Sequence, residues 1–429
     1  MNKPFRQLMP VLIISLLFFA FGFVTWTNSI LIPYLKLACQ LNNLESYLVA
    51  FAFYIAYLVM AIPAAELLKK TGFKNGMSAG LLIIAAGALL FIPAALTRFY
   101  PLFLLGLFVQ GTGLAVLQSA SNPYITILGP IESAAKRISL MGIFNKLAGA
   151  IAPVVLGAVT LKDADGLSGR LAAMGAAEKQ LQLDQLAHRV IWPYIIIMLV
   201  LLALAVFIRL SSLPEVETNQ NNDGSKSSVE VTLWQFPHLI VGVITLFAYV
   251  GVEVLAGDSI VNYGASQGIS LSTAKFFTAC TMCSMIAGYI VGIICIPRYL
   301  KQERALAISA ILGLIFSAAA LLTQGYISVF CIALLGLANA LVWPAVWPLA
   351  LRGLGSYTRT GSSLLVMGIA GGAVIPLIYG RLADLFGVHH AYLVLIPCYL
   401  MIFYFAVRGH RLIPSAVIAG KPELQPVNE

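Results

Sequence analysis

QSASNPYITILGPIESAAKRISLMGIFNKLAGAIAPVVLG, residues 118–157, is the stretch that decides the fold. We interpret it as an apolar helix broken by Pro123, a short basic loop, and a second apolar helix with Asn145 and Lys146 near its middle. Hydrocarbon offers no hydrogen-bond partner to an amide or an ammonium, so such groups are costly where they face lipid. We therefore expect Gln118, Asn122, Asn145 and Lys146 to face a polar interior.

The composition excludes a soluble protein. Of 429 residues, 60% are hydrophobic and 10% are charged, and apolar runs of about 20 residues, enough to cross a bilayer as a helix, recur along the chain. The net charge of +9 would suggest a nucleic-acid partner in a soluble protein, but here the basic residues lie in the turns between apolar runs. No nucleic-acid partner is expected. The six cysteines lack metal-site spacing, and neither a metal nor a cofactor is expected.

Hydropathy predicts an all-α membrane protein with twelve transmembrane helices in two six-helix bundles. The expected spans are residues 9–35, 46–67, 75–96, 101–127, 138–161, 190–210, 236–263, 271–297, 305–323, 327–350, 361–382 and 390–408. The expected domains are an N-terminal bundle at 1–210, a polar linker at 211–234, a C-terminal bundle at 235–411 and a tail at 412–429.

The distribution of basic residues predicts the orientation. Seventeen lysines and arginines fall in one set of alternating segments and eight in the other, three of them in the long loop at 162–188. Because positive residues favour the cytoplasmic side, we expect both termini, the linker and the tail in the cytoplasm. The pattern of the 162–188 loop predicts a short amphipathic helix lying on the external surface.

The two halves of the chain repeat each other. Met141-Gly142-Ile143 recurs as Met367-Gly368-Ile369, and the pair Pro153 and Gly157 recurs as Pro376 and Gly380. A duplication of six helices is typical of secondary transporters whose site lies near the membrane midplane between the two halves.

Aromatic and amide residues within the spans are candidate substrate-binding groups. Trp26 and Asn28 lie in the first span, and Trp343 lies one turn before Trp347 in the tenth. An indole stacks on the apolar face of a sugar while an amide reaches its hydroxyls. Asn262, near the outer end of the seventh span, is a further candidate. The alternatives are an interfacial anchor for Trp26 and dense packing for the tryptophan pair.

The seventh span carries two carboxylates, Glu253 near its middle and Asp258 nearer its outer end. A carboxylate within a membrane span needs a partner or a proton, so both are candidates for ion coupling, together with Lys146. The alternatives are a structural ion pair between Glu253 and Lys146 and a solvated outer position for Asp258.

Enzymatic chemistry is not indicated. All five histidines fall at span ends, and the sequence contains neither a pairing of nucleophile and base nor a phosphate-binding glycine loop. We expect neither an enzyme nor an ATP-driven pump.

Four stretches carry a resemblance to a known family: NSILIPYL (28–35), SASNPYITILGP (119–130), FNKLAGAIAP (144–153) and YVGVEV (249–254). In these stretches the chain resembles the major facilitator superfamily, and more narrowly its fucose-galactose-glucose:proton symporter family. The resemblance implies a monomeric sugar transporter of a bacterial inner membrane that moves a neutral hexose or N-acetylhexosamine together with a proton.

One departure from the family concerns coupling. Members that transport fucose carry proton-coupling carboxylates in the first and fourth helices, and the matching positions here are Ser29 and Gln118, which do not titrate. Glu253 and Asp258 are the candidates that remain. The alternatives to a symporter are a sugar uniporter, an efflux protein of the same fold, and a sugar sensor that does not transport.

Overall fold

The protein is an all-helical membrane protein. The computed structural model describes residues 3–127, 134–162, 165–211, 213, 236–296, 299–354 and 358–412, and every regular element in them is a helix. Eleven helical segments among these residues are long and apolar enough to cross a membrane. One of them has 55 residues, more than twice the length of a span, and breaks at Gly72, where φ is 75°. It supplies two spans, so the prediction of twelve is confirmed.

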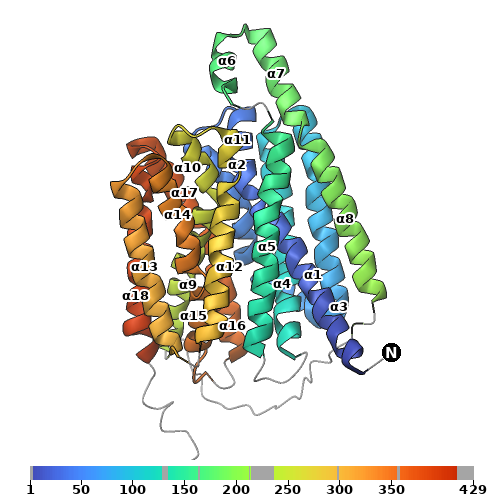
Figure 1. The fold of residues 1–429 in the computed structure, drawn as a ribbon. Helices are drawn as coiled ribbons and strands as arrows, with labels where there is room; N and C mark the ends of the chain where they lie inside the picture. Colours follow the sequence, from blue (N-terminus) through green and yellow to red (C-terminus); the bar gives the residue numbers. More distant parts are fainter. Residues whose placement is uncertain are drawn as a thin grey trace, which may run out of the picture.

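The first half of the chain forms one group of packed helices, on the right of Figure 1. Its membrane helices are α1 (Lys3–Trp26), α2 (Asn28–Ala38), α3 (Asn43–Thr97), α4 (Tyr100–Ile127), α5 (Ala134–Thr160) and α8 (Ile191–Leu210). Within the group α3 packs on α4 and α8, and α1 packs on α5. The helix α4 continues past Pro123, so the prediction of a helix break at this residue is wrong.

The second half forms the other group, on the left of Figure 1. Its helices are α9 (Pro237–Asp258), α10 (Ile260–Ser266), α11 (Leu271–Ala274), α12 (Phe277–Cys295), α13 (Gln302–Leu322), α14 (Gly325–Asn339), α15 (Val342–Ala350), α16 (Thr358–Met367), η4 (Gly368–Ala370), α17 (Gly371–Phe386), η5 (His390–Val394), α18 (Leu395–Val407) and η6 (Gly409–Arg411). The two groups meet where α3 packs on α17 and where α5 packs on α12.

Two predicted spans are each made of two consecutive helices. Thr27 joins α1 to α2 and Ser259 joins α9 to α10, and both residues keep a right-handed helical backbone. Their hydroxyl groups bond back to the preceding turn, Thr27 Oγ1 to Val24 O at 2.6 Å and Ser259 Oγ to Leu255 O at 2.5 Å. Side-chain bonds of this kind compete with the helical ladder and often bend a helix.

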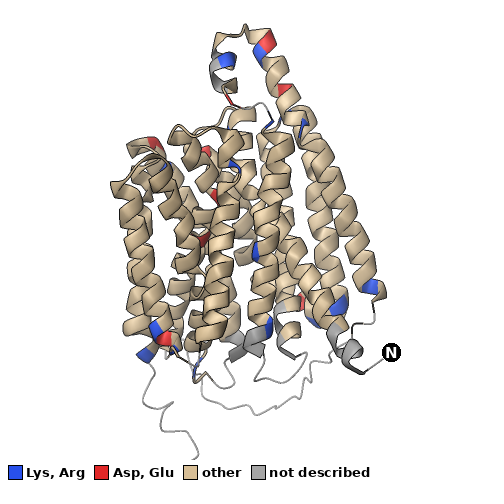
Figure 2. Ribbon diagram, viewed as in Figure 1, with Lys and Arg blue, Asp and Glu red and all other residues tan. Residues whose placement is uncertain are grey.

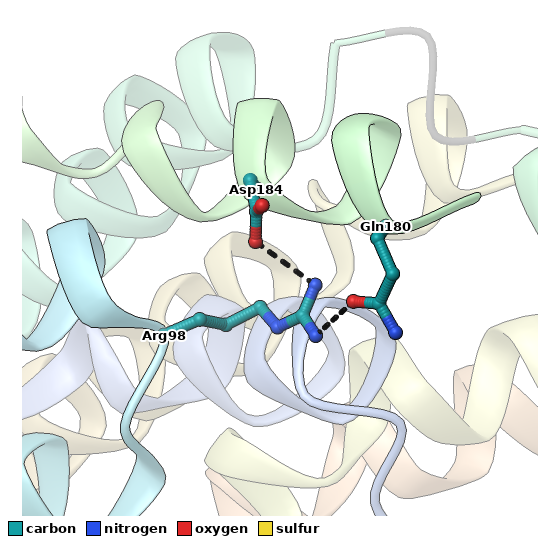
Figure 3. A network of polar contacts seen from close by, with 3 residues as sticks. All are labelled: Arg98, Gln180 and Asp184. Atoms are coloured by element: carbon teal, nitrogen blue, oxygen red, sulfur yellow. Dashed lines mark hydrogen bonds and ion pairs between the residues drawn. The ribbon is translucent and has the colours of Figure 1, made fainter. Parts of the chain in front are cut away.

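The loop between α5 and α8 projects from the body of the protein (Figure 1). It forms two helices, α6 (Leu167–Ala173) and α7 (Ala176–His188), so the expectation of one helix lying on the surface is wrong. Tyr34 Oη donates to Leu186 O at 2.7 Å at the base of α7. Arg98 donates to Asp184 at 3.0 Å and to Gln180 at 2.5 Å (Figure 3). These contacts hold α7 upright in line with α8.

We name the two ends of the molecule by these features. The hairpin end is the one that carries α6 and α7, and the terminal end is the one at which α1 begins, α8 ends and α9 begins (Figure 1). Among the described residues, the charged ones lie mainly toward these two ends, with few in the band between them (Figure 2). The predicted linker at 211–234 lies outside the described residues except for residues 211 and 213, and the predicted tail lies outside them except for residue 412.

Candidate functional site

A cavity of about 170 Å³ lies between the two groups of helices. Its walls come from α1, α3, α4 and α5 of the first half and from α9, α12, α15 and η4 of the second. Six of the predicted site residues line it: Trp26, Gln118, Asn145, Lys146, Glu253 and Trp343. Apart from the neighbours Asn145 and Lys146, these residues are far apart in the sequence, and the fold brings them together around one cavity.

Lys146 and Glu253 form an ion pair across the interface. Nζ of Lys146, on α5, lies 2.7 Å from Oε1 of Glu253, on α9, and the two side chains are 8% and 12% exposed. The same ammonium lies 4.3 Å from the centre of the Trp26 ring, a cation–π geometry. The predicted pairing of these two residues is therefore formed in this conformation, and the pair adds no net charge to the cavity wall.

Trp26 is held between two glycines. A Cβ atom at Gly149, on α5, would lie 2.5 Å from the indole Cδ1, and one at Gly257, on α9, would lie 2.2 Å from Cζ3. The indole N–H points to Asn145 Oδ1 at 3.3 Å, and the residue is 2% exposed. Trp26 thus lies at the interface of the two halves, which argues against the alternative of an anchor at the membrane surface.

Gln118 lines the cavity from α4. Its Nε2 donates to Tyr57 Oη at 2.9 Å, and both side chains line the cavity. Asn122 lies one turn further along α4, but its side chain is outside the described part of the structure.

The tryptophan pair of α15 contributes one residue to the site. The rings of Trp343 and Trp347 are stacked with centroids 5.2 Å apart, and Tyr249 lies 6.4 Å from Trp343. Trp343 lines the cavity, whereas Trp347 supports it from behind. Both interpretations of the pair, a cavity wall and dense packing, therefore apply, one to each residue.

Three predicted residues lie outside this cavity, toward the hairpin end. Asn28 is fully buried, Asp258 is 1% exposed and Asn262 is 8% exposed. Among the described residues, both polar atoms of Asn28, both carboxyl oxygens of Asp258 and the amide nitrogen of Asn262 have no hydrogen-bond partner. Asp258 is buried, which differs from the alternative of a solvated outer position.

Sequence reasoning missed the tyrosines of the cavity. Tyr54 and Tyr57 from α3, Tyr249 from α9 and Tyr289 from α12 line it together with the groups already named. A tyrosine deep in a lipid-spanning run was an available signal, because a buried phenol needs a hydrogen-bond partner. Tyr249 also lies one helical turn before Glu253, on the same face of α9.

The hairpin end is closed by two reciprocal contacts between the halves. Asp384, at the end of α17, accepts hydrogen bonds from the backbone N–H groups of Asn43 and Leu44, at 3.0 and 2.9 Å, where α3 begins. Asp165, after α5, accepts from the N–H groups of Leu271 and Ser272, where α11 begins. Each carboxylate caps a helix of the opposite half, where the helix dipole favours a negative charge.

The hydrogen bonds to Asp165 also stabilise its charge. Its slight burial acts to raise the pKa, but the hydrogen bonds from Ser272 and from the backbone of Leu271 outweigh that effect and hold the pKa of Asp165 below its ordinary value. The cavity, in contrast, extends toward the terminal end, where Phe18, Ile138 and Ser139 line it. The structure is thus closed at the hairpin end.

Comparisons with known proteins agree with this architecture. The family model described as Major Facilitator Superfamily matches residues 14–375. A protein of Brucella abortus named glucose/galactose transporter is 38% identical over 401 residues, 93% of each chain. A protein of Escherichia coli named L-fucose-proton symporter is 30% identical over 410 residues, 93% of this chain and 92% of its own.

Solved structures show the same fold. The transporter FucP, solved in the outward conformation, matches with a TM-score of 0.72 at 30% identity, over 93% of this chain and 98% of that one. A bacterial homologue of the lysosomal transporter Spinster, solved in an inward-facing conformation, matches in fold with a TM-score of 0.68 at 15% identity. The resemblance seen in the sequence is confirmed, and the chain belongs to the Major Facilitator Superfamily.

Proposed function

We propose that the protein is a secondary active sugar transporter, which takes up a neutral hexose or N-acetylhexosamine together with a proton. The observation that carries this proposal is the makeup of the cavity between the two halves. Amide groups of Gln118 and Asn145 face it together with the indoles of Trp26 and Trp343. Relatives named as glucose/galactose and fucose transporters over nearly the whole chain support the substrate class.

The charges of the cavity favour a neutral substrate. Lys146 and Glu253 satisfy each other at 2.7 Å, so no unpaired charge of the pair is available to attract an anion or a cation. Sugar hydroxyls both donate and accept hydrogen bonds, which suits amides and phenols, and the apolar C–H face of a pyranose suits an indole. A site for a drug-like apolar compound would need fewer of these amides, and we rank efflux below uptake for that reason.

We propose that the terminal end faces the cytoplasm of a bacterial cell and that the membrane is the inner membrane. The excess of basic residues in the segments of that end supports this orientation. The conformation is then inward-facing, closed toward the outside by the contacts of Asp165 and Asp384. The two halves, 1–210 and 235–411, move as bundles about the central site, with the linker and tail in the cytoplasm and the monomer as the working unit.

Coupling to a proton rests on the second half of the chain. Ser29, at one position where fucose-transporting relatives are expected to carry a carboxylate, donates to Trp26 O at 2.9 Å, and Gln118 holds the other position. Neither residue titrates. The charged groups that remain within the spans at the interface are Asp258 and the pair formed by Glu253 and Lys146. The same two neutral residues favour uniport as the second candidate function.

Purified protein in proteoliposomes tests the substrate site. We expect Gln118→Ala and Asn145→Ala each to weaken sugar binding by about 1–3 kcal/mol, because each truncation leaves a hydroxyl of a desolvated sugar unpaired. That range corresponds to roughly a ten- to hundredfold loss of affinity. Asn75→Ala removes an exposed amide that bonds only within α3, to Thr71 O, and serves as the matched control. Wild-type affinity in both cavity variants would exclude the proposed site.

The same vesicles separate symport from uniport. A symporter accumulates labelled sugar above the external concentration when a proton gradient is imposed, and a uniporter never does. Glu253→Gln keeps the shape of the side chain but cannot titrate, so a coupling role requires it to lose accumulation while exchange of sugar between equal concentrations continues. Accumulation by Glu253→Gln would assign coupling to another group.

A further inference from the structure

Asp258 is a buried carboxyl group that this conformation leaves without a partner. It is the last residue of α9, and it is 1% exposed. Neither of its oxygens accepts a hydrogen bond from any residue that the structure describes. It does not line the central cavity, so the substrate does not account for it.

The side chains that α3 and α12 place around Asp258 carry no charge. From α3 the phenols of Tyr47 and Tyr54 face it, and both are neutral at working pH. From α12, Thr278 and Thr281 donate to backbone oxygens of Gly257 and Ala256 rather than to the carboxyl.

The ring of Tyr379, on α17, packs against the ring of Tyr47, and the ring of Tyr392, on η5, packs against that of Tyr379.

The charged groups that face Asp258 are already paired with each other. Lys146, on α5, and Glu253, on the same helix as Asp258, both act on it electrostatically. Lys146 is bound to Glu253 at 2.7 Å and lies over the Trp26 ring, so its charge is satisfied elsewhere.

An isolated ionised carboxylate in an apolar interior is so unfavourable that such a group takes up a proton instead. Closure of the hairpin end is what isolates this one, because Trp26 of the first half packs on Gly257, next to Asp258. When the halves separate at that end, the carboxyl meets water again and ionises as an ordinary aspartate does.

We infer that Asp258 must bind a proton before the hairpin end closes, and that this carboxyl couples the proton to the transport cycle. The inference rests on the proposed function and assigns the proton to Asp258, which has no partner, rather than to Glu253, which is paired with Lys146. The proton passes from a hydronium ion of the external water to one carboxylate oxygen, which leaves a neutral carboxyl group and a water molecule. One proton is bound for each closure.

Distance measurements on the full-length protein test the inference without any sugar. Cysteines at Thr97 and Leu322, both exposed at the hairpin end and on opposite halves, would carry spin labels in a chain whose six native cysteines are alanine. Double electron–electron resonance in lipid nanodiscs then gives the fractions of closed and open molecules between pH 5 and pH 8.

We expect the ratio of closed to open molecules to fall up to tenfold for each unit rise in pH, as the uptake of one proton requires. Asp258→Asn should be closed throughout this range, with no pH dependence, because a neutral amide needs no proton. Asp258→Glu keeps a titrating carboxyl and should restore the pH dependence. Glu178→Gln, which removes an exposed carboxylate on α7, should behave as the parent protein.

Three results would overturn the inference: a parent protein whose closed fraction does not change with pH, an Asp258→Asn variant that keeps the parent's titration, or one that stays open throughout. Because these distances are measured without sugar, their outcome is distinct from a failure of the proposed sugar transport, which the vesicle assays report. In those assays Asp258→Asn should lose proton-driven accumulation.

Discussion

Lys146→Met is the substitution that most directly tests the electrostatics of the site. It removes the ammonium that lies 2.7 Å from Glu253 and leaves a carboxylate that is 12% exposed without its cation. Methionine keeps most of the volume of the lysine stem, so packing changes little. The substitution isolates the cost of an unpaired buried charge.

The loss of stability in Lys146→Met has an upper limit, and this limit depends on pH. Removing one partner of a buried ion pair typically destabilises a protein by about 3–5 kcal/mol. The remaining carboxylate can instead take up a proton, and protonating a glutamate from water costs roughly 3.7 kcal/mol at pH 7 but only about 1 kcal/mol at pH 5. The contact with the Trp26 ring is lost as well, which adds about 1–2 kcal/mol at either pH.

We therefore expect Lys146→Met to lose about 4–6 kcal/mol at pH 7 and about 2–3 kcal/mol at pH 5. The double variant Lys146→Met with Glu253→Gln leaves no charge unpaired and should lose only the ring contact, at both pH values. Free energies of unfolding from titrations with sodium dodecyl sulfate in mixed micelles would measure all three proteins.

Two outcomes would refute this reasoning. One is a loss in Lys146→Met that is the same at pH 5 and pH 7, which would mean that no carboxylate is left unpaired. The other is a double variant at pH 7 that is less stable than Lys146→Met, which would mean that Glu253 is held by contacts other than Lys146.

Two further predictions concern topology and the closed end. A cysteine at Asn222, in the predicted linker outside the described residues, should resist membrane-impermeant thiol reagents added to intact cells, and ready labelling from outside would reverse the orientation. Asp165→Asn should lower the ratio of closed to open molecules in the spin-label assay about three- to tenfold, the effect of losing charge-assisted hydrogen bonds worth about 1 kcal/mol. Because the pKa of Asp165 is lowered on folding, its stabilisation is complete above the ordinary aspartate range and is lost only as pH falls through the lowered value. Its effect should hence be constant from pH 5 to pH 8, unlike that of Asp258, and a change across that range would contradict it.

The candidate site was partly predictable for a simple reason. An amide, an indole or an ion within an apolar run is costly against lipid, and this alone selected Gln118, Asn145, Lys146 and Glu253, which the cavity brings together. The rule does not say which polar groups share one space, so Asn28 and Asn262 were predicted with equal reason and lie elsewhere. It also passed over tyrosines such as Tyr57, because their rings are apolar enough to suit a lipid-spanning helix.

The sequence by itself determined the twelve spans, since the length and hydrophobicity of a run that crosses a bilayer are local properties of the chain. It also determined the repeat of the two halves and the kinds of side chain available between them. Only the tertiary structure decided which side chains of one half lie against which side chains of the other. Trp26, packed between Gly149 of α5 and Gly257 of α9, lies where Lys146 meets Glu253, although 107 positions separate these two residues, and the same packing encloses Asp258 without a partner among the described residues. These pairings depend on how two rigid bundles are tilted against each other, and a chain built to alternate between tilts does not encode one of them in any local pattern.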